Sequence, residues 1–205
     1  MITVHHLDYS RSTRVLWFLE ELGVDYEVVR YRRKAGGPAP AELSLIHPLG
    51  KSPVIVDDGF MLAESSAILR YLDRMHGRQR FSPIDPKRAA LHDEWIDFVE
   101  GSAALPVLML LVGGSGLSDP LRKFATAELT KVFGHVSSAL ASVPFLAGNS
   151  FTLADIQISY ILAIARATGL LKDPTILSYL DRLHARPALV RAIERGGPMT
   201  PADRQ

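Results

Sequence analysis

The sequence predicts an α/β domain over residues 1–78 and an all-helical domain over residues 86–205. Three observations predict this division. Short β-branched runs alternate with helical patterns before residue 78, which is typical of a β-α-β unit with parallel strands. The polar stretch 78–86 contains two prolines, as linkers often do. The longer segments after it have helical spacing. The predicted element order of the first domain is β-α-β-α-β-β-α.

The elements of the first domain follow from local signals. A strand over residues 2–7 precedes a helix that begins near residues 10–13 and ends at Gly23. A second strand over 26–31 and a short helix over 41–46 come next. Residues 54–56 and 60–62 flank Asp57-Asp58-Gly59, which is a hairpin signal. The last helix of this domain begins at residues 64–66.

The second domain is predicted to begin with a helix at Asp85-Pro86 that Pro106 kinks and that residues 113–116 end. A helix over residues 120–142 follows. Thr152 and Asp155 have the spacing of a capping box, and the helix after them is apolar on nearly every side. We therefore expect that helix at the buried centre of the domain. Pro174 and Pro187 each begin a further helix.

Composition limits the possible functions. The 205 residues are 47% apolar and 22% charged, and 23 basic residues nearly balance 22 acidic ones. A surface for nucleic acid or anionic membrane is therefore not favoured, and the basic run 30–34 is more typical of a solvated strand end. The absence of cysteine excludes disulfides, thiolate metal sites and a nucleophilic cysteine. No signal pattern and no apolar run of 18 residues is apparent, so we expect a cytoplasmic protein without a membrane span.

Two positions are candidates for holding a peptide-like ligand. Ser52-Pro53 precedes a predicted strand, where either a cis or a trans peptide bond is possible. A cis turn would leave backbone groups free to pair with an extended ligand. Glu64-Ser65 begins a helix, whose free N–H groups and positive dipole suit a carboxylate, while Glu64 suits an ammonium group. Each position is also an ordinary turn or helix start.

Hydroxyl groups also follow the first strand, at the start of the first helix. Tyr9, Ser10 and Ser12 are the candidates, because a hydroxyl there can donate to a thiolate and lower the thiol pKa. No Gly-x-Ser-x-Gly elbow surrounds them, so a serine nucleophile is not indicated. Simple helix capping is the alternative role.

In combination, this order of elements resembles the cytosolic glutathione transferases over nearly the whole chain. Three stretches resemble the family strongly: residues 10–23 (SRSTRVLWFLEELG), 47–55 (HPLGKSPVI) and 62–68 (LAESSAI). The Thr152–Asp155 capping box matches the helical domain of the family. The sequence of residues 47–53 is most similar to that of a bacterial and fungal branch related to a yeast membrane-associated transferase.

The resemblance implies a thioredoxin-like first domain that binds glutathione, the co-substrate, without a metal. It implies that Pro53 is a cis-proline, that Ser52 pairs with the cysteinyl backbone, and that Glu64 and Ser65 hold the γ-glutamyl head. It also implies that Lys51, and with it His47, meets the glycyl carboxylate. Counted from the strand, Ser10 falls at the catalytic position; counted back from Gly23, Tyr9 does. We favour Ser10, with Ser12 as the third choice.

The implied reaction is attack by glutathione thiolate on small hydrophobic electrophiles, a detoxification activity, in a homodimeric enzyme. The electrophile is expected between the domains. Its expected contacts, which are equally good core candidates, are Trp95, Phe98, Val99, Ser102 and Pro106. The lack of cysteine excludes a thiol-exchange mechanism. The Ser-Ser-Cys-Ser signature of the maleylacetoacetate isomerase branch is missing, so membership of that branch is less favoured. Alternatives are a glutathione-dependent peroxidase and a non-catalytic glutathione-binding or regulatory protein of the same fold.

Overall fold

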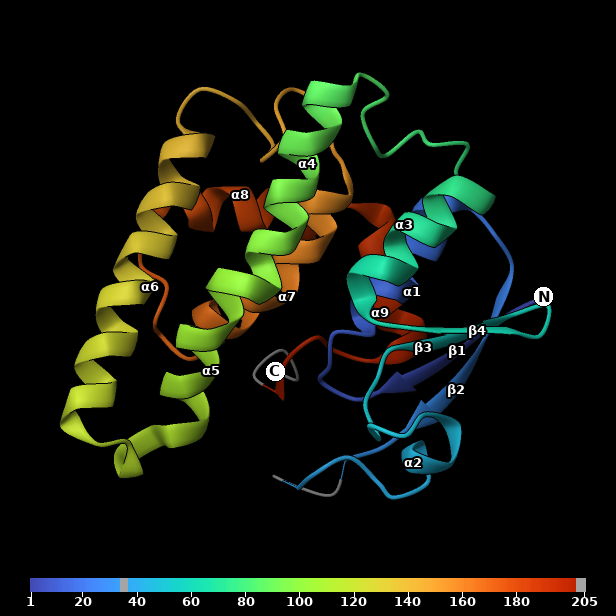
Figure 1. Cartoon of the computed structure of the whole chain (residues 1–205), viewed down its shortest axis with the longest axis horizontal. Helices are drawn as coiled ribbons and strands as arrows, with labels where there is room; N and C mark the ends of the chain where they lie inside the picture. The colour runs from blue at the N-terminus through green and yellow to red at the C-terminus, as the bar shows by residue number, and fades with distance from the viewer. Residues whose placement is uncertain (34–36, 202–205) are drawn as a thin grey trace. The chain divides into compact units, whose positions relative to one another are not determined.

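A computed structural model describes residues 1–33 and 37–201, which form two compact units (Figure 1). The first unit comprises Met1–Phe81 and the described residues from His184 onward, and the second comprises Ser82–Leu183. Lys34 of the basic run and residues 202–205 of the expected second domain lie outside the described residues. The division differs from the expected one at the C-terminal end, because the last helix of the chain packs within the first unit.

Four strands form a mixed sheet in the first unit, in the order β2-β1-β3-β4. β1 (Ile2–Leu7) pairs in parallel with β2 (Tyr26–Tyr31) and antiparallel with β3 (Val54–Asp57). β3 forms a hairpin with β4 (Phe60–Ala63). Its turn residues Asp58 and Gly59 both have positive φ, 46° and 86°, as a two-residue hairpin of this kind requires. The predicted β-α-β opening and the hairpin are therefore confirmed.

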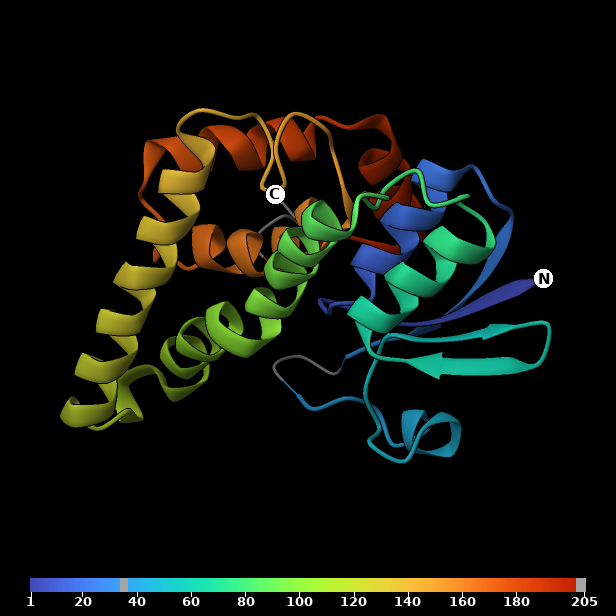
Figure 2. The same ribbon diagram turned by 45° about the horizontal axis from the view of Figure 1, so that its top comes forward.

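Helices cover both faces of this sheet. α1 (Thr13–Leu22) and α3 (Ser65–Met75) lie on one face, and α2 (Leu43–Ile46), a single turn, lies on the other (Figure 2). α9 (Pro187–Gly196) packs against α1. The core is built from apolar side chains of β1, α1 and α3 that are fully buried. The predicted order β-α-β-α-β-β-α is confirmed.

Ion pairs hold α9 on α1. Arg186 donates to both carboxylate oxygens of Glu21, at 2.6 and 2.9 Å. Arg191 and Arg195 both donate to Glu20, at 2.7 and 3.2 Å. These bonds, together with the apolar face of α9, explain why the C-terminal helix belongs to the first unit rather than to the helical one.

The helical unit begins with one long, irregular helix. α4 (Pro86–Phe98) continues through a π-helical turn, Val99–Ala103, into α5 (Ala104–Gly113). Pro106 has no N–H, so the carbonyl four residues before it lacks its α-helical partner, and the backbone widens directly before the proline. The expected irregularity at Pro106 is thus a π turn. A 3₁₀ turn, Gly114–Gly116, ends the helix.

The same stretch, Pro86–Gly116, is long and apolar enough to cross a membrane by length and composition alone. Its most apolar 18-residue window has a mean hydropathy of 1.7, and 33% of that window is buried. Glu100 and other polar residues interrupt this stretch, so its uninterrupted apolar runs are shorter than 18 residues, and the expectation drawn from such runs rests on a different criterion from the mean hydropathy. The core helix of a soluble protein passes the same test, so the finding is weak evidence for a span.

Three further helices complete this unit: α6 (Asp119–Leu140), α7 (Leu153–Ala167) and α8 (Pro174–His184). α4 and α5 both pack against α7. Every residue of α7 from Leu153 to Ala165 is buried. This confirms that α7 is the central helix of the unit, as a sequence that is apolar on nearly every side predicts.

Asp155 anchors the start of α7 and is completely buried. One carboxylate oxygen accepts from the Leu146 amide at 3.0 Å and from the Tyr179 hydroxyl at 2.6 Å. The other accepts from the amide and the hydroxyl of Thr152, at 2.8 and 3.2 Å. Burial raises the pKa of Asp155, while these hydrogen bonds act in the opposite direction. The predicted reach of Asp155 to the capping amide is confirmed.

Replacing Asp155 tests how much this anchor stabilises the protein. Asp155→Ala leaves several buried donors without an acceptor, and each costs about 1–3 kcal/mol. We expect the free energy of unfolding in urea to fall by about 3 kcal/mol or more. Thr130→Ala, on the exposed face of α6, is the control and should change it by less than about 0.5 kcal/mol. A loss for Asp155→Ala no larger than that of the control would contradict this reading.

Candidate functional site

The turn between β1 and α1 carries the three hydroxyl candidates. Ser10 and Ser12 are buried, and Tyr9 is half-buried with φ at 52°. Asp8 holds the entry to the turn, because its carboxylate accepts from Arg30 at 2.7 Å and its carbonyl accepts from Arg33 at 3.0 Å. The turn is therefore fixed by polar contacts on both sides of Tyr9.

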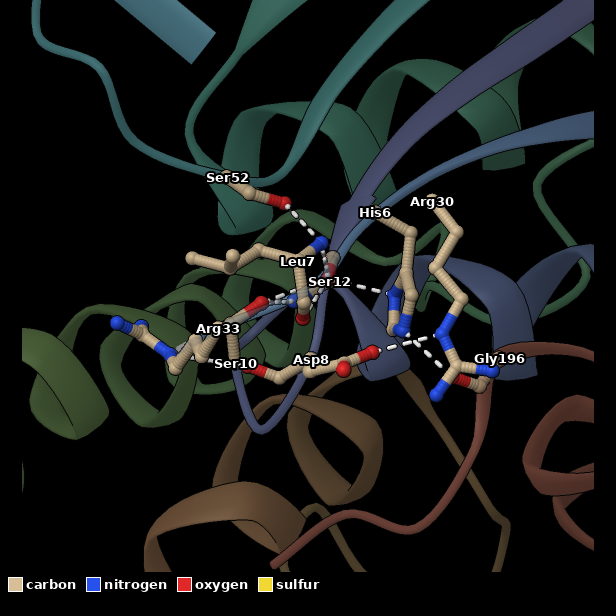
Figure 3. Close-up of polar contacts among 9 residues, drawn as sticks. All are labelled: His6, Leu7, Asp8, Ser10, Ser12, Arg30, Arg33, Ser52 and Gly196. Carbon is tan, nitrogen blue, oxygen red and sulfur yellow. Dashed lines mark hydrogen bonds and ion pairs between the residues drawn. The ribbon is translucent and has the colours of Figure 1, made fainter. Parts of the chain in front are cut away.

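Ser12 sits at the centre of a polar network (Figure 3). Its Oγ lies 2.7 Å from Ser10 Oγ and 2.7 Å from His6 Nδ1. It also lies 3.3 Å from both the amide nitrogen and the carbonyl oxygen of Leu7. The donor and acceptor positions of this hydroxyl are thus all engaged within the protein. Ser10 Oγ also accepts from the Ser12 amide at 3.2 Å.

The Ser52-Pro53 loop joins the same network. The peptide bond between these residues is cis, as the resemblance implied, and Pro53 is buried. The Leu7 amide donates to Ser52 Oγ at 3.2 Å, and Ser52 Oγ donates to the carbonyl of His5 at 2.7 Å. The side chain of Ser52 therefore pins this loop to the last residues of β1, close to the turn that holds Ser10.

The start of α3 is tied to α1. Ser65, its first residue, is buried, and its Oγ accepts from Nη1 of Arg14 at 3.1 Å. Arg14 is itself completely buried on α1. Glu64, the residue before the helix, is exposed with φ at 69°. A helix N-terminus with a guanidinium behind its first hydroxyl favours an anion electrostatically.

Lys51 and His47 lie on the loop before β3. Lys51 is exposed, and His47 is half-buried with its Nδ1 accepting from the Leu49 amide at 3.4 Å. The structure thus brings Ser10, Ser12 and Ser52 into one network. It joins Ser65 to α1 through Arg14, and it leaves Lys51 at the surface.

Comparison with known proteins gives the family. The family model described as glutathione S-transferase, N-terminal domain, matches residues 1–74, and the one for the C-terminal domain matches residues 117–195. Glutathione S-transferase 3 of Schizosaccharomyces pombe is 33% identical over 214 residues, covering 95% of this chain and 88% of that protein. The chain belongs to the glutathione S-transferase family.

Solved structures of the family are similar over the whole chain. A glutathione S-transferase from Actinobacillus pleuropneumoniae has a TM-score of 0.90 and 31% identity, covering 100% of this chain and 97% of that one. A theta class glutathione S-transferase from Xanthomonas axonopodis pv. citri, solved with glutathione bound, has a TM-score of 0.75 at 23% identity, covering 96% and 99%. The second shares the fold.

The five residues expected to contact the electrophile all lie on the long helix of the second unit. Trp95 stacks on His135 of α6, with ring centroids 4.6 Å apart and an interplanar angle of 17°. Phe98 meets both rings edge-on, at 5.4 and 5.3 Å. Val99 and Pro106 are buried, whereas Ser102 is exposed. The helix therefore places these residues on more than one of its faces.

Two buried residues of the site were not anticipated from the sequence. His6 lies on β1 in the alternating register of Ile2 and Val4, which are buried core residues. That register was the available signal: a histidine in a core position of a strand needs a hydrogen-bond partner. Arg14 gave no comparable signal, because basic residues in a first helical turn are common on solvated faces.

Burial sets the charge state of His6. Burial lowers the pKa of His6 from 6.5 to about 4, and the nearby Arg30 guanidinium also lowers it. The hydrogen bond to the Gly196 carbonyl and the Asp8 carboxylate act in the opposite direction. The imidazole is therefore neutral at neutral pH.

This low pKa predicts a pH dependence of stability. The unfolded chain binds a proton at His6 below about pH 6.5 and the folded protein only below about pH 4, so stability is lost as the pH falls through this window. We expect His6 to contribute a loss of about 3 kcal/mol between pH 7 and pH 4. Urea unfolding of the protein and of His6→Asn at several pH values isolates the contribution of His6 to the pH dependence of the free energy of unfolding. Identical slopes for the two proteins would contradict it.

Proposed function

We propose that this protein conjugates glutathione, as its thiolate, to small hydrophobic electrophiles. The observation that carries the proposal is the shared Leu7 amide. It donates to both Ser12, the hydrogen-bond partner of Ser10, and Ser52, the residue before the cis-proline. One strand end thus holds both the hydroxyl turn and the cis-proline loop, which supports a site for a sulfur atom beside the backbone of a short peptide. Family membership supports glutathione as that peptide.

Each part of the site is assigned one part of glutathione. We infer that Ser10 donates to the sulfur, since Ser12 Oγ is already engaged on all sides. The Ser52-Pro53 backbone takes the cysteinyl residue, and Glu64 and Ser65 take the γ-glutamyl head. Lys51 and His47 take the glycyl carboxylate. We assign Tyr9 no contact with the sulfur.

Catalysis then consists of raising the thiolate fraction and holding two reactants together. Lowering a thiol pKa from about 8.5 to about 6.5 changes a small thiolate fraction at pH 7 into a majority. We propose that the electrophile contacts the helical unit through Trp95, Phe98 and Ser102. The buried Val99 and Pro106 are assigned to shaping that surface from within. Detoxification of such electrophiles in the cytoplasm is the role that we infer.

Turnover assays with two substrates test this function. We expect glutathione-dependent conversion of an aryl halide. Ser10→Ala should lower kcat/KM by roughly 10- to 100-fold, because a hydrogen bond to a charged group is worth about 1.5–3 kcal/mol. The pKa of the bound thiol, followed by thiolate absorbance, should rise by about 1–2 units in this variant. Ser138→Ala, on the exposed surface of α6, is the matched control.

The same assays separate the alternatives. Turnover of an organic hydroperoxide without turnover of the aryl halide would favour the peroxidase. Glutathione binding without turnover of either substrate would favour a non-catalytic binding protein. Full conjugation activity with an unchanged thiol pKa in Ser10→Ala would remove Ser10 from its role.

We also propose that the protein is a C2 homodimer, the commonest symmetric assembly. Exposed apolar side chains on β4 and at the end of α3, namely Phe60, Met61 and Met75, support this proposal, because exposed apolar patches often mark interaction sites. Light scattering at micromolar concentration should give twice the mass of one chain. A single-chain mass under these conditions would overturn the dimer while leaving the proposed chemistry untouched.

A further inference from the structure

A continuous chain of hydrogen bonds leads from Ser10 into the core of the first unit (Figure 3). Ser10 Oγ and Ser12 Oγ are 2.7 Å apart, and Ser12 Oγ lies 2.7 Å from His6 Nδ1. His6 Nε2 lies 3.0 Å from the carbonyl oxygen of Gly196, the last residue of α9. The exposed fractions of Ser10, Ser12 and His6 are 6%, 0% and 1%. The chain is thus sheltered from water along its length.

The far end of this chain decides the direction of every proton in it. A carbonyl oxygen only accepts, so His6 Nε2 carries the hydrogen and donates to Gly196. His6 Nδ1 of the neutral ring is then an acceptor, and Ser12 donates to it at 2.7 Å rather than to the more distant Leu7 carbonyl at 3.3 Å. Ser12 has one proton, so Ser10 donates to Ser12. As a result, Ser10 Oγ keeps a lone pair, and not its proton, for an incoming ligand.

The charged groups that face His6 leave this direction undisturbed. Arg30 and Asp8 are its charged neighbours among the described residues, and they pair with each other at 2.7 Å. Their effects on the imidazole are of opposite sign. Burial is the largest effect and keeps the ring neutral when no ligand is bound.

We propose that Ser10, Ser12 and His6 form a proton relay that carries the thiol proton of glutathione inward to His6 Nδ1. This proposal rests on the proposed function, in which Ser10 meets the sulfur. The thiol S–H first donates to the lone pair of Ser10. The thiol proton then moves to Ser10 Oγ, the proton of Ser10 moves to Ser12 Oγ, and the proton of Ser12 moves to His6 Nδ1. The products are a thiolate and an imidazolium, and the net charge is unchanged.

Hydrogen-bond satisfaction supports this relay. After the shift, His6 Nδ1–H donates to Ser12, Ser12 donates to Ser10, and Ser10 donates to the thiolate. Each of these buried polar atoms has a partner both before and after the shift, so neither state carries an unsatisfied group. The thiolate charge favours the imidazolium, and the relay requires that the pKa of His6 in the complex rise above that of the bound thiol. After the sulfur–carbon bond forms, the proton returns outward through Ser12 and Ser10 to solvent.

Two substitutions of His6 separate proton acceptance from hydrogen bonding. In His6→Asn, the amide oxygen takes the place of Nδ1 and accepts from Ser12, but the side chain takes no proton and is too short to replace Nε2 at Gly196. In His6→Leu, both hydrogen bonds are lost. His76→Asn is the matched control, because His76 bonds Asp57 at 2.8 Å, and Asp57 pairs with the first residue of β1, at the end remote from Leu7.

The expected result is a split between binding and turnover. His6→Asn should bind glutathione with a Kd within about threefold of the unmodified protein, while kcat with an aryl halide falls roughly 100-fold, the lower end of the range of acid–base catalysis. The solvent deuterium isotope effect should lose its multi-proton component. His76→Asn should change neither quantity. In the unmodified protein, the ¹⁵N resonance of His6 Nδ1 should move to the protonated value when glutathione binds and ionises.

The proposal is overturned if His6→Asn keeps kcat within twofold, or if His6 Nδ1 stays unprotonated in the thiolate complex. If His6→Leu does not fold, the kcat of His6→Asn alone decides the proposal. Absence of any turnover by the unmodified protein would instead refute the proposed function, and the NMR titration with glutathione would still decide whether His6 receives the proton.

Discussion

The amide of Leu7, at the last residue of β1, is the point on which the site depends. It donates to Ser12 and to Ser52, so the turn after β1 and the cis-proline loop are held by one backbone hydrogen. Two hydroxyls compete for that hydrogen, and each is held in place by a second bond, from Ser12 to His6 and from Ser52 to the His5 carbonyl. A shift of either loop therefore changes the position of the other. This coupling holds the hydroxyl of Ser10 at a fixed place relative to the cis-proline.

The C-terminal helix completes this arrangement, although it lies at the other end of the chain. A histidine buried in a sheet needs partners for both ring nitrogens, and the strand supplies neither. Gly196 supplies one through its carbonyl, and α9 is held in position by the ion pairs of Glu20 and Glu21. A side chain at Gly196 would meet both His6 and Leu16, so the close approach of α9 requires a glycine there. The first unit therefore includes α9, because α9 supplies the hydrogen-bond acceptor for the buried His6.

Much of the fold was predictable because its signals are local. Asp58-Gly59 specifies a hairpin turn through backbone conformation, and Thr152 with Asp155 specifies a helix start through bonds three residues apart. The cis bond at Pro53 followed from resemblance, since the residues alone left both isomers open. The return of α9 and the partners of His6 and Arg14 depend on contacts between distant segments, and no spacing in one sequence encodes them. The bond from His6 to Gly196 spans 190 positions.

Asp155 in the helical unit and His6 in the first unit are both buried polar acceptors, and they differ in what they can do with a proton. The two carboxylate oxygens of Asp155 accept hydrogen bonds from four donors, and each donor keeps its hydrogen. Such a group fixes structure. His6 has two unlike nitrogens, one committed to a carbonyl and one facing a hydroxyl, so a proton added at the second nitrogen reverses the hydroxyl chain without breaking it. A buried network can pass a proton when one end is a fixed acceptor and the bonds at the other end can reverse direction. Of the two networks, that of His6 leads to Ser10, which lies beside the proposed position of the sulfur.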